Sequence, residues 1–84
     1  MYIYMISQSV NKGYDTYDSA VVYAHNDKDA ITIHPNGYDD PEWWLKNDEW
    51  STWDYDLTNI TVEKLGVAKE GATRGVICAS FNAG

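Results

Sequence analysis

The sequence indicates a single small α+β domain over residues 1–84, built on one antiparallel β-sheet with one short helix. Four segments rich in β-branched and aromatic residues are separated by turn residues, which is a pattern typical of β-strands. Between the second and third of these segments lies a polar stretch that starts with helix-capping residues and ends in a proline. A chain of 84 residues also buries only a thin interior. The predicted order along the chain is therefore strand, strand, helix, loop, strand, strand (ββαββ).

The first two strands are predicted to form a β-hairpin. Residues 2–8 (YIYMISQ) contain no glycine or proline, and residues 17–25 alternate apolar side chains between two faces. Asn11 and Gly13 lie between these segments, and both residue types accept the positive φ angles of a turn. We therefore expect an opening hairpin with a wide connecting loop.

A short helix is expected after the hairpin. Asn26 or Asp27 can supply a side-chain oxygen to the first turn, and Pro35 disfavours helical backbone at His34. A helix of about two turns is not stable alone, so we expect it to pack on one face of the sheet.

The last two strands are predicted at residues 59–67 (NITVEKLGV) and 76–81 (VICASF). The final strand has apolar residues on both faces, which is typical of an interior strand covered on both sides. We expect Cys78 within it to be a buried and unreactive core residue.

Residues 38–56 hold all four tryptophans and seven of the thirteen acidic residues. Pro41 and Asn47 argue against a long helix, so the segment is interpreted as a Trp-rich loop with a short turn over residues 42–46. We expect this loop to cover the face of the sheet that the helix leaves open. Trp43 and Trp44 are adjacent and cannot easily point into one core, so one ring is expected to complete the core and the other to line a site.

Composition restricts the classes of partner. The single cysteine excludes an internal disulfide, and two histidines provide too few ligands for a typical structural zinc site. We therefore expect self-association into a homo-oligomer to supply the extra stability that a small domain needs. A formal charge of −7 disfavours nucleic acid and anionic membranes as partners. The chain lacks a run of eighteen apolar residues and its first residues lack the basic start of a signal peptide, so we expect a cytoplasmic protein.

The segment 14–19 (YDTYDS) repeats a Tyr-Asp pair at a spacing of three residues. Aspartate carboxylates accept hydrogen bonds from a diol or an amine, and tyrosine offers a stacking face with a donor at its tip. The same residues also fit a loop in which the aspartates form Asx turns and the tyrosines cap the edge of the core. In the first interpretation, these residues bind a ligand together with tryptophan rings, and an arginine side chain contacts the phosphates of the ligand. The candidate ligand-binding residues are then Tyr14, Asp15, Tyr17, Asp18, Ser19, Trp43, Trp44 and Arg74.

A second candidate surface is acidic and aromatic and would contact another protein; it comprises Asp48, Glu49, Trp50 and Trp53. The carboxylates of residues 39–49 lack the spacing of a calcium-binding loop, so no metal and no other cofactor is predicted. His34, Cys78 and the serines have no nucleophile elbow or glycine-rich phosphate loop around them, so we predict that the protein is not an enzyme.

The chain resembles a widespread group of small phage and prophage accessory proteins. The resemblance is carried, in order, by MYIYMISQ, YDTYDSAVV, a helix ending in IHP, the tryptophan-rich middle and the ending GVICASFNAG, and it covers nearly the whole chain. It implies a phage protein that acts against host defence, and it assigns no catalytic or binding residue.

Two functions are compatible with that implication. One is sequestration of a nucleotide-derived immune signal, of the ADP-ribose or cyclic-nucleotide type, in a pocket of aromatic residues and aspartates. The other is direct inhibition of a host defence protein, in the manner of an anti-CRISPR protein, through the acidic Trp-rich loop. We favour the first, because the Tyr-Asp repeat lies in a hairpin turn where a compact site is easily assembled.

Overall fold

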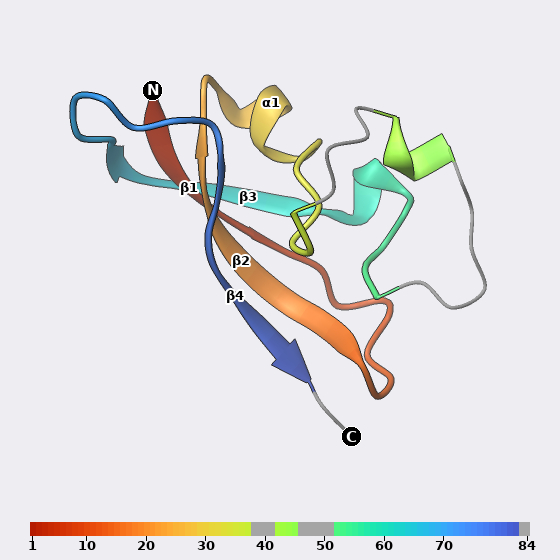
Figure 1. Ribbon diagram of the computed structural model, residues 1–84. Helices are drawn as coiled ribbons and strands as arrows, with labels where there is room; N and C mark the ends of the chain where they lie inside the picture. Colours follow the sequence, from red (N-terminus) through yellow and green to blue (C-terminus); the bar gives the residue numbers. More distant parts are fainter. Residues whose placement is uncertain (38–41, 46–51, 83–84) are drawn as a thin grey trace.

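The computed structural model describes residues 1–37, 42–45 and 52–82 and contains a four-stranded antiparallel sheet (Figure 1). The strands are β1 (Tyr2–Ser7), β2 (Thr16–Ala24), β3 (Thr61–Val67) and β4 (Gly75–Asn82). One α-helix, α1 (Asp27–Ala30), and two 3₁₀ helices, Trp43–Leu45 and Leu57–Asn59, lie between β2 and β3. These elements are mostly sheet and are compatible with the predicted α+β class.

The strands do not lie in chain order. β1 and β2 form the predicted hairpin at the centre, β3 pairs with β1, and β4 pairs with β2, giving the spatial order β3-β1-β2-β4. The last two strands are therefore separated by the hairpin, and the chain between them crosses one end of the sheet (Figure 1). The Ala68 N–H donates to the Met1 carbonyl (3.1 Å) and holds this crossing against the start of β1.

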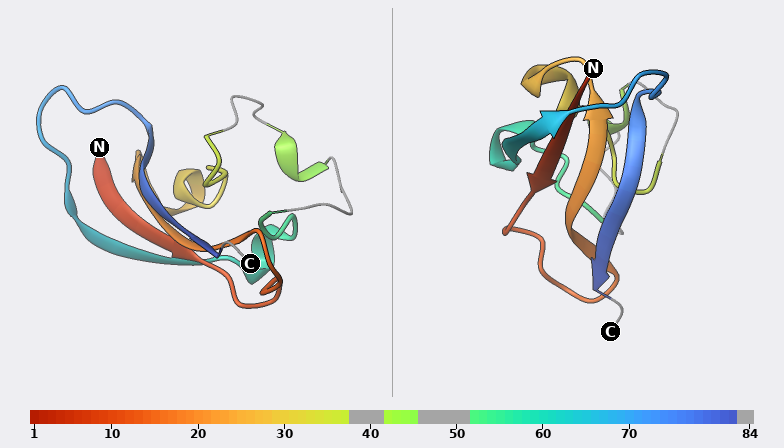
Figure 2. Two further views of the ribbon diagram at one scale, coloured as in Figure 1. Left: turned by 60° about the horizontal axis from the view of Figure 1, so that its bottom comes forward. Right: turned by 90° about the vertical axis from the view of Figure 1, so that its left-hand side faces the viewer.

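The core lies on one face of the sheet. Paired residues of the central hairpin, such as Ile6 with Ala20 and Tyr4 with Val22, point to this face and are buried. The helix and both 3₁₀ segments lie on the same side (Figure 2). Within the described ranges, the buried hydrophobic residues are Tyr4, Ile6, Ala20, Val22, Ala24, Ala30, Ile33, Trp43, Trp53 and Ile60.

The expectation that the Trp-rich loop covers the opposite face is wrong for its described part. Trp43 and Trp53 are 2% and 1% exposed and belong to the same core as Ala30 of α1. A physical reason is visible in β2, where the small residues Ala20 and Ala24 on the core face leave room for large rings.

The prediction that the final strand is interior is also wrong. β4 is the outermost strand of the sheet on the side of β2, and its residues from Ile77 to Asn82 are exposed. Cys78 is consequently exposed rather than buried. Apolar residues on both faces indicate that a segment favours strand conformation, but they do not indicate which strands lie beside it in the sheet. The same pattern therefore also occurs in edge strands.

Helix α1 has the predicted cap but is shorter than expected. The Asn26 side chain accepts the Asp29 N–H (2.8 Å), and the helix ends at Ala30 with Ile31 as its C-cap. The carbonyl of Thr32 accepts a hydrogen bond from the Trp43 indole N–H (2.7 Å). The chain past Ala30 therefore bonds to the Trp-rich segment instead of continuing the helix.

Candidate functional site

A pocket of about 400 Å³ opens between the loop after β1 and the Trp-rich segment. Its volume lies in the lower part of the range of about 300–1,000 Å³ that is usual for small-molecule sites. We call it the Trp44 pocket; it is lined by Val10, Asn11, Trp44, Trp53, Asp54, Tyr55 and Asp56.

The first wall of the pocket is positioned by Gln8, a buried polar residue just after β1. Its amide oxygen accepts the backbone N–H groups of Val10 (3.0 Å) and Asn11 (2.7 Å). Its amide nitrogen donates to the carbonyls of Asn11 (2.7 Å) and Tyr17 (2.9 Å). Asn11 in turn donates to the Trp53 carbonyl (3.2 Å), so one glutamine ties the hairpin loop to the opposite wall.

The aromatic wall comes from the Trp-rich segment and its contact with the core. Trp43 is buried and Trp44 is half-buried, and the two rings meet edge to face at 5.6 Å between centroids. Tyr55 packs edge-on against Trp43, with centroids 5.3 Å apart. The two adjacent tryptophans therefore differ in burial, as predicted. The half-buried ring of Trp44, which lines the pocket, packs against the buried ring of Trp43.

Two carboxylates form the polar side of the pocket. The oxygens of Asp54 accept the Asp56 N–H (2.9 Å) and the Asn59 side-chain amide (3.0 Å). One oxygen of Asp56 accepts both the hydroxyl and the backbone N–H of Thr58, at 2.6 and 3.0 Å. These Thr58 hydrogen bonds, the side-chain one foremost, lower the pKa of Asp56, so the carboxylate is charged at neutral pH. Among the described residues, no donor is recorded at the other Asp56 oxygen, Oδ2.

The chemistry of the Trp44 pocket suits a ligand with a flat ring and hydroxyl or amino groups. Aromatic faces stack bases, and carboxylates accept hydrogen bonds from sugar hydroxyls or amines. The described lining residues include two acids and no lysine or arginine. A phosphate group is therefore disfavoured inside the pocket and would have to remain outside it.

Residues 14–19 are not gathered into one site. Tyr14 is 80% exposed, and Asp15 occupies the left-handed region (φ 59°) in the turn before β2, with its N–H donating to the Asn82 carbonyl (2.7 Å). Tyr17 packs on Phe81 with ring centroids 4.8 Å apart. Asp18 lies at an irregularity in the β2–β4 register, and Ser19 pairs with Ser80. The segment runs from a turn into a strand, so its side chains diverge to different faces.

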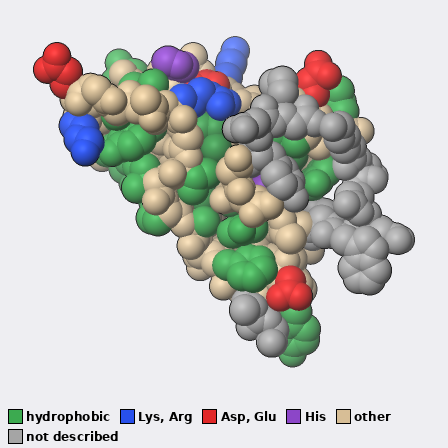
Figure 3. Space-filling view, in the orientation of Figure 1, with side chains coloured by type: hydrophobic (Ala, Val, Ile, Leu, Met, Phe, Trp, Pro, Cys, Tyr) green, Lys and Arg blue, Asp and Glu red, His purple; other side chains and the backbone are tan. Residues whose placement is uncertain are grey.

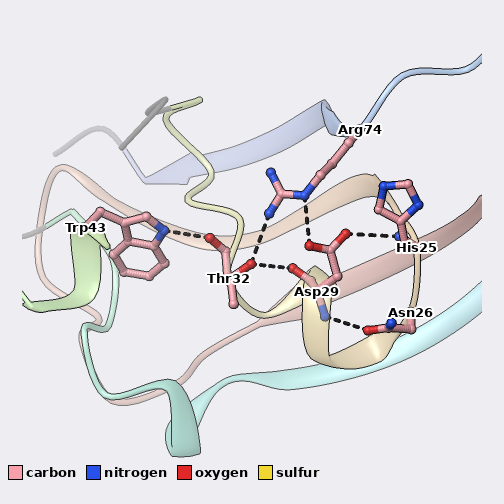
Figure 4. Close-up of polar contacts among 6 residues, drawn as sticks. All are labelled: His25, Asn26, Asp29, Thr32, Trp43 and Arg74. Atoms are coloured by element: carbon pink, nitrogen blue, oxygen red, sulfur yellow. Dashed lines mark hydrogen bonds and ion pairs between the residues drawn. The ribbon is translucent and has the colours of Figure 1, made fainter. Parts of the chain in front are cut away.

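Arg74, the candidate phosphate ligand, makes a structural contact instead (Figure 4). Its Nε donates to Asp29 Oδ1 (2.9 Å) and its Nη2 donates to Thr32 Oγ1 (3.0 Å), which ties the residue before β4 to α1. Partial burial alone would raise the pKa of Asp29. The hydrogen bond from the His25 N–H and the Arg74 guanidinium outweigh this effect and hold the pKa below its ordinary value.

The variant Arg74→Met is expected to lower the free energy of unfolding by about 0.5–1 kcal/mol, since partly exposed ion pairs contribute little. The Arg74 and Asp29 side chains are 42% and 23% exposed, so solvent screens their attraction. Urea unfolding followed by circular dichroism measures the change. Lys69→Met is the control for loss of one positive charge; an equal effect in both variants contradicts a specific role for the Arg74 contact.

The predicted protein-contact surface is only partly described. Asp48, Glu49 and Trp50 lie outside the described residues. Trp53 was predicted to face a partner, but it is 1% exposed and belongs to the core, so that prediction is wrong for this residue. The cause is burial by loop closure, since the Tyr17 N–H donates to the Thr52 carbonyl (2.8 Å) and draws the segment onto the start of β2.

His34 lies in the core and not in the pocket. Its ring is 1% exposed and meets Trp43, Tyr55 and Tyr17 edge to face, at centroid distances of 4.8, 6.2 and 6.4 Å. Its Nδ1 accepts the Asn36 N–H (3.0 Å), and burial lowers the pKa of the imidazole to about 4. Among the residues that the structure describes, no cluster of three potential metal ligands occurs.

The sequence interpretation missed Val10, Asn11, Asp54, Tyr55 and Asp56 as lining residues. The motif DYD at positions 54–56 belongs to the acidic Trp-rich segment. Its alternation of carboxylate and ring beside Trp53 was an available signal. The contribution of Val10 and Asn11 depends on the Gln8 contacts and had no equivalent signal.

Comparisons with protein-family models, with curated proteins and with solved structures find no match to this chain. In the described part of the chain, no helix has the length and apolar character needed to cross a membrane.

Proposed function

We propose that this protein is a non-enzymatic phage accessory protein that sequesters a nucleotide-derived host immune signal. The single observation that supports this is the Trp44 pocket, in which aromatic rings and two carboxylates line a volume of about 400 Å³. The signal belongs to the ADP-ribose or cyclic-nucleotide class, and the protein acts in the host-cell cytosol during infection.

The base of the ligand stacks on the aromatic wall. Trp44 is half-buried in a 3₁₀ helix and is backed edge-on by Trp43, so binding requires little ordering of its ring. A stacked base is worth about 1–3 kcal/mol. This contact supplies affinity without demanding one particular base.

The ribose hydroxyls donate to the carboxylates. Asp54 and Asp56 are held in place by their hydrogen bonds to Asn59 and Thr58. A carboxylate that reads a ribose diol is a recurrent solution in nucleotide-binding proteins. The phosphates then extend from the mouth of the pocket into solvent, away from these charges.

A thermal-shift titration tests the proposal. At a concentration one hundred times the dissociation constant, a ligand stabilises the folded state by about 2.7 kcal/mol, which corresponds to a rise in Tm of about 10 °C or more in a domain of this size. We expect such a rise with ADP-ribose derivatives or cyclic nucleotides and none with inorganic phosphate. Trp44→Ala is expected to weaken binding by about 5- to 150-fold, and Asp54→Asn to weaken it further for ligands with a free diol.

Tyr14→Ala is the matched control, because this aromatic residue is 80% exposed and outside the pocket. Loss of binding in Asp18→Ala with retention in Trp44→Ala would move the site to the hairpin turn and contradict the pocket assignment. Absence of a shift with the whole panel, together with capture of a basic host defence protein that is lost in Asp48→Lys, would favour the direct-inhibitor function.

A further inference from the structure

The two edge strands of the sheet, β3 and β4, differ in the charge of their side chains. β3 carries Glu63 and Lys64, and its register with β1 shifts between Ile3 and Tyr4, which leaves Leu65 as an extra residue. Charged side chains and bulges both hinder the pairing of an edge strand with another chain. β4 has a register shift of its own, so the charges are what distinguish the two edges. β4, with the sequence GVICASFN, has no charged residue and no proline.

The outer edge of β4 is open over most of its length in the described structure. Six consecutive residues, Ile77–Asn82, are exposed, with Ile77 at 43% and Phe81 at 47%. In Figure 3, charged side chains gather mainly toward the top of the face that β4 fronts, and one acidic side chain lies near its lower end. Uncharged atoms fill the middle. An edge strand of this kind presents unpaired N–H and C=O groups to a second strand.

We propose that β4 pairs antiparallel with β4 of a second copy of this chain, so that one sheet runs through a two-fold symmetric dimer. Antiparallel pairing of identical strands is self-complementary, because each strand donates and accepts at equivalent positions. Ile77 is the extra residue of the register shift opposite Val21 and Val22. The regular pairing therefore covers the residues that follow it, 78–82, and Ile77 lies directly at the end of the paired stretch.

The absence of charge makes β4 the edge at which a second copy of this acidic chain is repelled least. The chain carries a formal charge of −7, so most approaches of two copies bring carboxylates together. β4 is an eight-residue strand without acidic residues, so pairing through it leaves the Asp18 carboxylate one strand away, in β2. A strongly acidic or basic partner would gain no complementary charge from β4, whereas an identical strand gains a full set of backbone hydrogen bonds.

Sedimentation equilibrium of the full chain is expected to show a monomer–dimer equilibrium, and Ile77→Lys tests its location. Leu65→Lys is the matched control, since Leu65 is also the extra residue of an edge-strand irregularity and is 52% exposed. We expect Ile77→Lys to raise the dimer dissociation constant about tenfold or more, because each substitution acts twice in an isologous interface. Leu65→Lys is expected to leave it within about twofold. Circular dichroism confirms that both variants are folded.

Cysteine cross-linking provides a second readout that does not depend on destabilising β4. In a two-fold antiparallel pair, only residues near the axis lie within disulfide range of their own equivalents, at Cα separations of about 4.4–6.8 Å. We compare native Cys78 with two variants that carry Cys78→Ser and either Ala79→Cys or Ser80→Cys. Cross-linking is expected to peak at one or two adjacent positions, and Cys78→Ser with Leu65→Cys is expected to give none.

A monomer at all accessible concentrations, or an assembly that forms through Leu65 and not β4, overturns the proposal. The Trp44 pocket and β4 share no residue, so failure of either proposal leaves the other standing.

Discussion

Replacing Trp43 by alanine is expected to lower the free energy of unfolding by about 3–5 kcal/mol. The side chain is 2% exposed, its Nε1–H donates to the Thr32 carbonyl (2.7 Å), and its ring contacts His34 and Tyr55. Small domains have only about 0.05–0.15 kcal/mol of stability per residue, so this loss is a large fraction of the total. The variant is expected to be partly unfolded at 37 °C, as measured by urea denaturation and circular dichroism.

Trp44→Ala is the matched control, because it removes the same side chain from the next residue. Trp44 is half-buried and lies against the Trp44 pocket, so we expect a loss below about 2 kcal/mol. Trp43→Phe separates the contribution of ring packing from that of the indole hydrogen bond. It keeps an aromatic ring but leaves the Thr32 carbonyl without the indole donor. Equal destabilisation by Trp43→Ala and Trp44→Ala would contradict the division of burial between these rings.

Acidification from pH 6.5 to pH 4 is expected to lower the free energy of unfolding through His34. Burial lowers the pKa of this imidazole to about 4 in the folded protein, below its ordinary value of 6.5. The unfolded chain therefore binds the proton first, and stability falls as the pH drops through this window. With about 1.4 kcal/mol for each pKa unit, the loss reaches about 3 kcal/mol at pH 4. Urea titrations at several pH values measure the slope.

The variant His34→Phe is expected to flatten this slope, whatever its effect on stability at neutral pH. His25→Phe is the control, because His25 is exposed. The carboxyls of Asp29 and Asp56 have lowered pKa values, so their contribution is present above the ordinary carboxyl pKa and is lost below about pH 4. Their effect thus falls in a separate window. A slope between pH 6.5 and 4 that survives in His34→Phe would assign it to another group.

Local patterns predicted the elements whose partners are close in sequence. Alternation in residues 2–8 and 17–25 predicted the central hairpin. Asn26 or Asp27 was expected to cap the helix, and Asn26 is the cap. These features depend on side-chain alternation and on a hydrogen bond between residues three apart, which leave a signal in any short window. The turn predicted over residues 42–46 appears as the 3₁₀ helix Trp43–Leu45.

The sequence predicted the residue types of the candidate site but not most of its positions. Aromatic rings and aspartates were expected together, and Trp44 does line a pocket with Asp54 and Asp56. The hairpin residues Tyr17 and Asp18 were expected there but lie in β2, outside the pocket lining. What brings Asn11 to the pocket is the buried amide of Gln8, whose partners are known only when the chain is folded.

Residue type and order in this chain are enough to specify the strands, the helix cap and the acidic, aromatic character of the middle segment. Tertiary packing alone decided that β4 is an edge strand, that Trp43 and Trp53 share the core with α1, and that Arg74 bonds to Asp29. The physical reason is the range of the interactions. Alternation and capping act over a few residues, whereas the neighbour of β4 in the sheet and the burial of Trp53 depend on contacts between segments that are distant in the sequence.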